Sequence, residues 1–356
     1  MKSDFLLYGA TGFVGGAVAR IAVQSGLRPV LAGRDAAKLG PQAAELGVEF
    51  QAFSLEDSAT MDRALATVPV VLHCAGPFRY TSGPMAAACL RTGTHYLDLT
   101  GEIPVYEALA ARDADARARG IMLLPGAGFD VVPTDCLAVH LKQRLPSATH
   151  LALAFHSEGP AGFPPGTQRT VIDLIPYGNR VRRNGRLENP RRRLPPRMID
   201  FGRGPIRADW LTWGDVFTAY RSTGIPDIED YAVQPETTRR LQALAGHLRL
   251  LFRLAAVRNL AMRGAKPGPT PDECARTVVH AWGEVEDDQH RKAVSRLHGP
   301  EAGVLWTTRA ALAAVRKVLA GNAPAGFQTP ALAYGPDFVL ECEGVTREDD
   351  PILGRS

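Results

Sequence analysis

Cysteines are few in this sequence of 356 residues, and long apolar runs are absent from it. The five cysteines are odd in number and form no Cys-x-x-Cys pair, which argues against both a disulfide framework and a structural zinc site. No run of about 18 apolar residues occurs, so we expect no transmembrane span, and no apolar signal-peptide core follows Met1. These absences predict reduced thiols, no bound metal and a cytoplasmic location.

Strong charge imbalance and the common hydrolase and nucleotidase motifs are missing as well. The net charge is only +4, which is too small an excess to indicate nucleic-acid binding. The motifs H-E-x-x-H, G-x-S-x-G and G-x-x-x-x-G-K-[ST] do not occur, so zinc protease, α/β-hydrolase and P-loop chemistry are disfavoured. A hydrophobic content of 45% with 22% charged residues is typical of a globular protein, and the length allows two cores.

Short apolar segments alternate with helical patterns through the first 130 residues. Strands are expected at 5–8, 28–32, 48–53, 70–74, 95–98 and 121–124, and helices at 14–25, 36–46, 58–66, 85–92 and 106–119. This alternation predicts an α/β fold with an N-terminal Rossmann domain, a doubly wound parallel sheet, over residues 1–130.

The pattern changes after residue 130, which predicts a second, α+β domain with a mixed sheet over 131–320. Residues 150–156 alternate with period two, as an antiparallel strand does. A helix is expected at 236–263, a strand pair at 278–284 and 291–297, and a last helix at 307–319. We expect the C-terminal segment 321–356 to pack back on the first domain.

A glycine loop follows the first predicted strand and opens the first predicted helix. Its first glycine allows a tight turn, the second a close approach of a pyrophosphate to the backbone, and the third close packing of helix and strand. A helix N-terminus also favours an anion. We therefore predict a dinucleotide site with the contacts Gly9, Ala10, Thr11, Gly12, Phe13 and Val14.

The end of the second predicted strand carries Gly33 and Arg34, with Lys38 one helical turn further on. NAD-preferring sites usually hold an acidic residue here, whereas a guanidinium can bind the 2′-phosphate of NADP(H) in a bidentate way. Asp35 is adjacent, and a solvated surface arginine is the alternative interpretation. NADP(H) is the predicted cofactor.

Three further strand ends bring small or polar residues to the same edge of the predicted sheet. After the fourth strand we expect cofactor contacts from Ala75, Gly76, Pro77 and Phe78. After the fifth and sixth strands the candidate catalytic residues are Tyr96, Asp98, Glu102 and Asp130. The alternative is structural, namely that these side chains cap helices and orient loops.

These segments together resemble the saccharopine dehydrogenase-like oxidoreductases, including the trans-acting enoyl reductase branch. The resemblance rests on residues 9–15, 31–34, 75–78, 95–102 (His-Tyr-Leu-Asp-Leu-Thr-Gly-Glu) and 128–135 (Gly-Phe-Asp-Val-Val-Pro-Thr-Asp), with further segments at 213–226, 282–285 and 326–331. It implies an NADPH-dependent reductase acting on a C=C bond of an enoyl, lipid-like or polyketide-like substrate. Such a substrate would be free or linked to a carrier protein or to coenzyme A. An imine reductase or amino-acid dehydrogenase of the saccharopine type and a non-catalytic NADP(H) sensor are the alternatives. No nucleic-acid partner is expected, and a homodimer is left open.

Two segments of the second domain could bind partners. Residues 180–197 are rich in arginine and could dock an anionic partner, although a solvated loop with a hairpin turn at Asn184-Gly185 is the preferred interpretation. Residues 241–262 are apolar with interleaved arginines. An amphipathic core helix is preferred there over an acyl tunnel, a membrane-surface helix or a dimer face.

Overall fold

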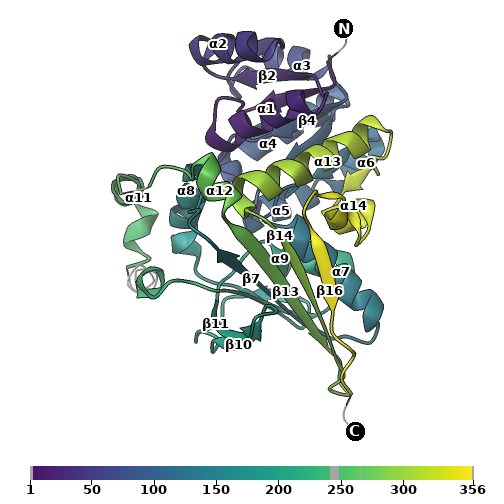
Figure 1. Cartoon of the computed structure of the whole chain (residues 1–356). Helices are drawn as coiled ribbons and strands as arrows, with labels where there is room; N and C mark the ends of the chain where they lie inside the picture. Colours follow the sequence, from purple (N-terminus) through teal and green to yellow (C-terminus); the bar gives the residue numbers. More distant parts are fainter. Residues whose placement is uncertain (1–2, 241–247, 265, 355–356) are drawn as a thin grey trace. The chain divides into compact units, whose positions relative to one another are not determined.

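The structure is a computed structural model that describes residues 3–240, 248–264 and 266–354 (Figure 1). Its contacts divide the chain into two compact units, Met1–Val132 with Gly303–Tyr334 and Pro133–Ala302 with Gly335–Ser356. Within the described ranges, no helix combines the length and the apolarity needed to cross a membrane.

The first unit is built on a seven-stranded parallel sheet in the order β15-β6-β5-β4-β1-β2-β3. Its strands are β1 (Phe5–Tyr8), β2 (Pro29–Gly33), β3 (Phe50–Ala52), β4 (Val70–His73), β5 (His95–Asp98), β6 (Met122–Leu124) and β15 (Gly326–Phe327). Its helices are α1 (Phe13–Gln24), α2 (Ala36–Leu46), α3 (Ser58–Leu65), α4 (Phe78–Thr92), α5 (Ile103–Ala110), α6 (Asp113–Arg119), α13 (Thr307–Leu319) and α14 (Pro330–Tyr334). The predicted Rossmann fold is confirmed.

Burial on both faces explains why the central strands of this sheet are uniformly apolar. Every residue of β1 and of β4 is buried, so neither strand shows polar alternation. The strand order reverses between β1 and β4, and ligands of doubly wound sheets bind outside the carboxyl ends of the strands at such a point. The glycine loop lies at this position in the topology.

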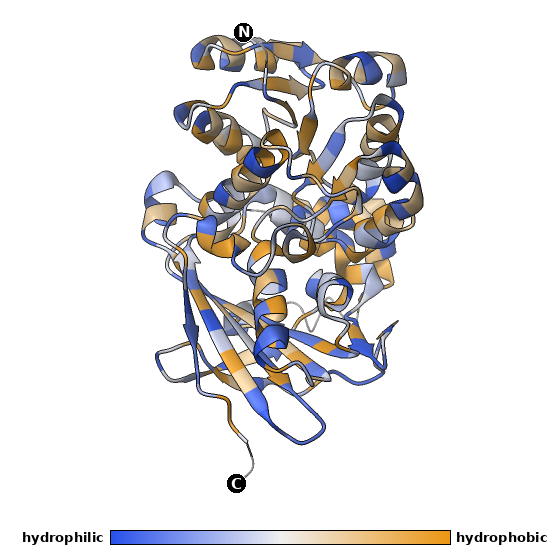
Figure 2. Cartoon of the chain, turned by 90° about the vertical axis from the view of Figure 1, so that its right-hand side faces the viewer, coloured by the Kyte–Doolittle hydropathy of each residue, from blue (hydrophilic) through white to orange (hydrophobic). Residues whose placement is uncertain are grey.

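The second unit contains a mixed sheet in the order β10-β11-β12-β7-β13-β14-β16, with the hairpin β8–β9 attached to β12. The strands are β7 (His150–Glu158), β8 (Val181–Arg183), β9 (Arg186–Glu188), β10 (Arg197–Asp200), β11 (Pro205–Trp210), β12 (Asp227–Ala232), β13 (Val278–Glu286), β14 (Lys292–Pro300) and β16 (Thr346–Asp349). The helices are α7 (Val132–Arg144), α8 (Pro165–Leu174), α9 (Asp215–Thr223), α11 (Ala255–Met262) and α12 (Pro271–Ala275), with short helical turns η1 (Ile175–Tyr177), η2 (Leu251–Arg253) and η4 (Phe338–Glu341). Hydrophobic and hydrophilic residues alternate along its long strands, as Figure 2 shows, and β14 is buried at every second position.

Several predicted elements of the second unit are confirmed and one is wrong. The hairpin turn lies at Asn184-Gly185, where both residues have positive φ, and β13 and β14 form the predicted antiparallel pair. Strand β7 pairs antiparallel with β13, as predicted, and parallel with β12 on its other side. The continuous helix predicted over 236–263 is wrong, because the extended backbone of Leu254 separates η2 from α11. Residues 241–247 of that prediction lie outside the described residues.

Two helices of the first unit also differ from the prediction. Helix α4 begins at Phe78, seven residues before its predicted start at 85, because the Glu102 carboxylate accepts from the backbone N–H groups of Phe78 and Arg79 at 2.9 and 3.2 Å. The helix predicted over 106–119 is two helices, α5 and α6, separated after Ala110. The earlier start of α4 arises from a contact distant in sequence, which an apolar pattern does not record.

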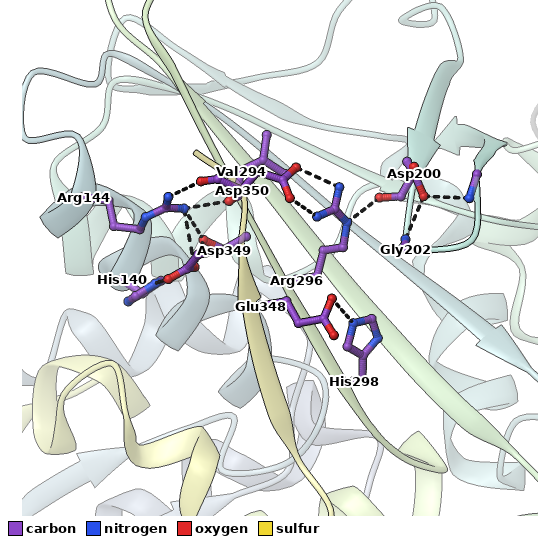
Figure 3. Close-up of polar contacts among 12 residues, drawn as sticks. His140, Arg144, Asp200, Gly202, Val294, Arg296, His298, Glu348, Asp349 and Asp350 are labelled. Atoms are coloured by element: carbon purple, nitrogen blue, oxygen red, sulfur yellow. Dashed lines mark hydrogen bonds and ion pairs between the residues drawn. The ribbon is translucent and has the colours of Figure 1, made fainter. Parts of the chain in front are cut away.

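The C-terminal segment is shared between the two units. Strand β16 pairs with β14, and Arg296 binds both carboxylate oxygens of Asp350 at 2.6 and 2.9 Å (Figure 3). Arg144 also donates to the backbone carbonyl of Asp350. We expected the segment 321–356 to pack on the Rossmann domain. Its residues up to Tyr334 belong to the first unit, through β15 and α14, whereas residues 335–356 belong to the second unit. Helix α13, predicted in the second domain, groups with the first unit.

Candidate cofactor site

The glycine loop between β1 and α1 is built so closely that side chains are excluded from two of its positions. Gly9 has φ +88°, and a Cβ there would lie 2.8 Å from the backbone nitrogen of Ala75. A Cβ on Gly15 would lie 2.2 Å from the carbonyl oxygen of Gly9, closer than any real contact. The loop therefore requires glycine at both positions, as the sequence predicts.

The predicted contacts of the loop lie on both sides of the start of α1. Helix α1 has Gly12 as its N-cap and no side chain capping it, and Thr11, Gly12 and Phe13 are exposed, whereas Ala10 is buried and Val14 half-buried. A helix N-terminus with no side-chain cap offers backbone N–H groups and the positive end of the helix dipole to an anion. This arrangement fits the pyrophosphate of a dinucleotide.

Gln42 of α2 supports the same loop, and sequence reasoning missed it. Its Nε2 donates to the carbonyl oxygen of Ala10 at 2.9 Å, across 32 residues of sequence. A single glutamine on a helix carries no recognisable signal, so only the packing of α2 beside the loop reveals this contact.

Arg34 and Lys38 are both exposed just beyond the carboxyl end of β2, where Gly33 is buried. The neighbouring Asp35 caps α2, and its carboxylate accepts from the backbone N–H groups of Ala37 and Lys38 at 3.0 and 3.3 Å. The same carboxylate lies 3.6 Å from the Lys38 ammonium in an exposed ion pair. Because Asp35 is engaged in this cap, the arrangement favours an anion at Arg34 over a ribose hydroxyl at Asp35.

Replacing Arg34 with alanine should weaken NADPH binding about 10- to 100-fold and leave NADH binding nearly unchanged, because a 2′-phosphate loses a bidentate partner that a 2′-hydroxyl does not use. Fluorescence titration with both cofactors would measure this. Arg63→Ala, which removes an exposed arginine of α3, is the matched control and should change neither affinity. Equal losses for NADPH and NADH would remove the role of Arg34 in cofactor choice.

At the carboxyl end of β4, Ala75, Gly76 and Pro77 lead into α4, whose first residue is Phe78. The Thr81 hydroxyl donates to the Ala75 carbonyl at 2.7 Å and lies 2.9 Å from His73 Nε2. Burial lowers the pKa of His73 to about 3, so this histidine is neutral. Burial, with a further contribution from Asp98, raises the pKa of the Cys74 thiol, so Cys74 is not an activated nucleophile.

Tyr96 and Asp98 of β5 meet side by side, as their spacing of two residues predicts. The Tyr96 hydroxyl donates to Asp98 Oδ2 at 2.6 Å, and Asp98 Oδ1 accepts from the backbone N–H groups of Thr100 and Gly126, both at 2.9 Å. Both side chains are fully buried. Burial raises the pKa of Asp98 to about 6, although the three hydrogen bonds oppose this shift. Asp98 therefore holds the turns at Thr100 and Gly126 together, and its pKa lies closer to neutral pH than that of an ordinary carboxyl.

Glu102 has a different environment. Besides binding the N-terminus of α4, it is almost fully buried, and its backbone N–H donates to the Thr100 hydroxyl at 3.0 Å. The Tyr106 hydroxyl donates to the Thr100 carbonyl in the same turn. These contacts support the structural alternative for Glu102, since its carboxylate serves as the cap of α4.

Asp130 is the one half-buried member of the four candidate catalytic residues. It follows β6 and lies against the turn after β5, where a Cβ on Gly101 would be 3.1 Å from Asp130 Oδ2. The sheet thus brings Tyr96, Asp98, Glu102 and Asp130 to its carboxyl edge, but with unequal exposure. Their catalytic roles stay predictions.

Comparison with known proteins relates this site to a family. Residues 5–124 match the family model of the saccharopine dehydrogenase NADP binding domain, in agreement with the predicted cofactor. A trans-acting enoyl reductase of Mycobacterium leprae is 36% identical over 150 residues, and one of Mycobacterium tuberculosis is 34% identical over 151 residues. Each alignment covers 40% of this chain and 36% of the relative, so the chain matches only about a third of those relatives' length.

A solved structure shares the whole architecture. The saccharopine dehydrogenase (L-Glu forming) of Saccharomyces cerevisiae superimposes with a TM-score of 0.64 over 98% of this chain and 100% of that chain. The sequence identity is 13%, so this likeness shows the fold alone. The family model matches part of the first unit, and the similarity in fold to the solved structure extends over both units.

Proposed function

We propose that this chain, whose residues 5–124 match the saccharopine dehydrogenase NADP binding domain, reduces the C=C bond of an enoyl substrate with NADPH. The observation that carries this proposal is the sterically closed glycine loop with exposed Arg34 beside it, in a chain whose relatives include trans-acting enoyl reductases. When bound, NADPH supplies a hydride.

In this proposal, the loops at the carboxyl ends of the parallel strands bind different parts of NADPH. Backbone groups of residues 9–14 bind the pyrophosphate, and Arg34 and Lys38 bind the 2′-phosphate. Residues 75–78 provide the small-residue surface beside the nicotinamide end of the cofactor. Reduction of a C=C bond also requires a proton, and a carboxyl whose pKa is raised to about 6 keeps a proton in a minor fraction of the molecules at neutral pH. We assign that task to Asp98 together with Tyr96.

A cavity in the second unit supports a substrate that carries a phosphate. It has a volume of about 360 Å³ and is lined by Arg193, Leu194, Pro196, Arg207, Asp209, Trp210, Arg239 and Arg240. Arg207 and Arg239 share one carboxylate, that of Asp209, at 2.9 and 3.6 Å, and Arg240 pairs with Glu236. Four guanidinium groups against two carboxylates leave an excess of positive charge, which suits a phosphate group on an apolar arm. We propose that this is the phosphopantetheine phosphate of a coenzyme A or carrier-linked acyl group.

Replacing Arg239 with glutamine should raise KM for a coenzyme A-linked enoyl substrate about 10-fold and leave KM for the corresponding N-acetylcysteamine thioester unchanged, since that thioester lacks the phosphate. Steady-state NADPH oxidation would measure both constants. The matched control is Arg192→Gln, an exposed arginine that does not line the cavity. A parallel rise of KM for both thioesters would mean that Arg239 does not recognise phosphate.

The reaction itself is tested by following NADPH absorbance with enoyl thioesters and, separately, with a 2-oxo acid plus an amine. We expect oxidation with the enoyl thioesters. Turnover only with the oxo acid and amine would favour the imine reductase alternative. Tight NADPH binding with no turnover on either class would favour the non-catalytic sensor.

A further inference from the structure

Five leucines are exposed within 13 residues of the second unit, in and around η2 and α11. They are Leu248, Leu250, Leu251, Leu254 and Leu260, with 43, 63, 52, 58 and 63% of their surface exposed. Single exposed leucines are ordinary, but such a concentration on one segment marks an interaction surface. We call residues 248–264 the leucine–arginine segment.

The leucine–arginine segment is not the core helix that its sequence suggests. No residue of η2 or of α11 is buried. Helix α11 contacts α8 and η2, and η1 contacts η2. The aromatic ring of Tyr177 in η1 is also exposed, at 45%. The apolar side chains therefore face outward instead of completing a core.

The charge on this surface has one sign. Residues 237–271 contain no Asp or Glu, while Arg249, Arg253 and Arg263 are exposed. Arg258 differs, because it lies inward with its Nε 2.9 Å from a carboxylate oxygen of Asp173 on α8. One arginine thus anchors the segment to α8, and the other three present positive charge beside the leucines.

We propose that the leucine–arginine segment binds the surface of a membrane that contains anionic lipids. Exposed leucines can enter the region between headgroups and acyl chains, and arginines alongside them attract anionic headgroups. An exposed tyrosine beside such a segment is suited to the same interface, because its ring is amphipathic. This inference concerns where the protein acts and goes beyond the proposed reaction.

Charge distinguishes a lipid surface from a second copy of the chain. In a twofold symmetric dimer through this face, the arginines of one copy would oppose those of its partner, and no acidic residue of the segment could neutralise them. An anionic bilayer supplies the missing charge. The lipid surface therefore satisfies both the apolar and the charged part of the segment.

Vesicle co-sedimentation of the full chain tests the proposal. We expect binding to vesicles of phosphatidylcholine mixed with phosphatidylglycerol, about 10-fold weaker binding to phosphatidylcholine alone, and weakening by high salt. Leu250→Asp with Leu254→Asp should reduce binding about 10-fold or more, because each change puts a charge where an apolar group inserts. Arg249→Gln with Arg253→Gln should remove the preference for phosphatidylglycerol while leaving weak binding.

Matched variants keep the test specific to this surface. Met198→Asp changes an exposed apolar residue of β10, 66% exposed, and Arg191→Gln with Arg192→Gln removes two exposed arginines; both should bind vesicles like the wild type. NADPH titration and thermal unfolding confirm that every variant is folded. Absence of vesicle binding by the folded wild type overturns the proposal. The proposal is also overturned if sedimentation velocity shows that the wild type is a dimer, that the leucine variants are monomers, and that these variants still bind vesicles like the wild type.

Discussion

Gly15→Ala should weaken NADPH binding by at least about 100-fold, which is about 2.7 kcal/mol. The added methyl group would lie 2.2 Å from the carbonyl oxygen of Gly9 and 2.9 Å from its carbonyl carbon. Both neighbours are backbone, so relief requires α1 to move away from β1 or the loop to change shape. Either movement displaces the N–H groups that the pyrophosphate binds. Isothermal titration with NADPH measures the effect.

The adjacent residue provides a control of the same chemistry. A Cβ on Gly16 would have its nearest neighbour, the Ala10 carbonyl oxygen, at 3.6 Å, which is an ordinary contact. Gly16→Ala should therefore keep NADPH affinity within about threefold. Alanine favours a helix over glycine by up to about 1 kcal/mol, and this gain applies to Gly15→Ala and Gly16→Ala alike. Thermal unfolding of both variants separates lost affinity from lost folding. If Gly15→Ala binds NADPH as tightly as Gly16→Ala, the loop does not hold the pyrophosphate.

The parallel sheet could be predicted from sequence because its signal is local. Strands such as β1 and β4 are short apolar runs buried on both faces, and the alternation with helices fixes their parallel arrangement. The glycine loop could be predicted for the same reason, since its steric requirement appears directly as Gly9 and Gly15. The exposure of Arg34 just after β2 agrees with its predicted place, and its contact with a phosphate stays a prediction.

What could not be predicted depends on contacts between distant residues. The start of α4 is set by Glu102, 24 residues after Phe78, and the loop is braced by Gln42 from another helix. The capping partners of the Glu102 carboxylate are therefore not recognisable in the sequence, and its catalytic role stays a prediction. The core helix expected around Leu250 is wrong, because an apolar pattern predicts burial but does not say whether a partner surface is present.

Replacing Asp98 with asparagine should separate the structural role of this carboxyl from its ability to hold a proton. Oδ1 of Asp98 accepts from the N–H groups of Thr100 and Gly126, and asparagine retains that oxygen. Its Nδ2 can donate to the Tyr96 oxygen once that hydroxyl turns, so all three hydrogen bonds persist. The variant should fold, but it cannot titrate.

The stability difference between wild type and Asp98→Asn should depend on pH in a defined direction. The folded-state pKa of Asp98, about 6, lies above the value near 3.9 of an unfolded chain. The carboxyl therefore stabilises the fold below about pH 4, and this contribution is lost as pH rises through 6. At about 1.4 kcal/mol per unit, the free energy of unfolding of wild type relative to Asp98→Asn should fall by up to about 3 kcal/mol between pH 4 and 7. Urea denaturation at each pH measures it, and a constant difference would contradict the raised pKa.

Turnover shows whether that proton is used in the reaction. If Asp98 supplies the proton, wild-type kcat should fall about tenfold per pH unit above 6, and Asp98→Asn should lose about 100-fold in kcat with NADPH affinity unchanged. A purely structural Asp98 would leave kcat of Asp98→Asn within a few-fold of wild type and its pH profile unaltered. Asp98→Leu is the structural reference, because it leaves the Tyr96 hydroxyl and two buried N–H groups without their acceptor and should be about 3 kcal/mol or more less stable than Asp98→Asn at every pH.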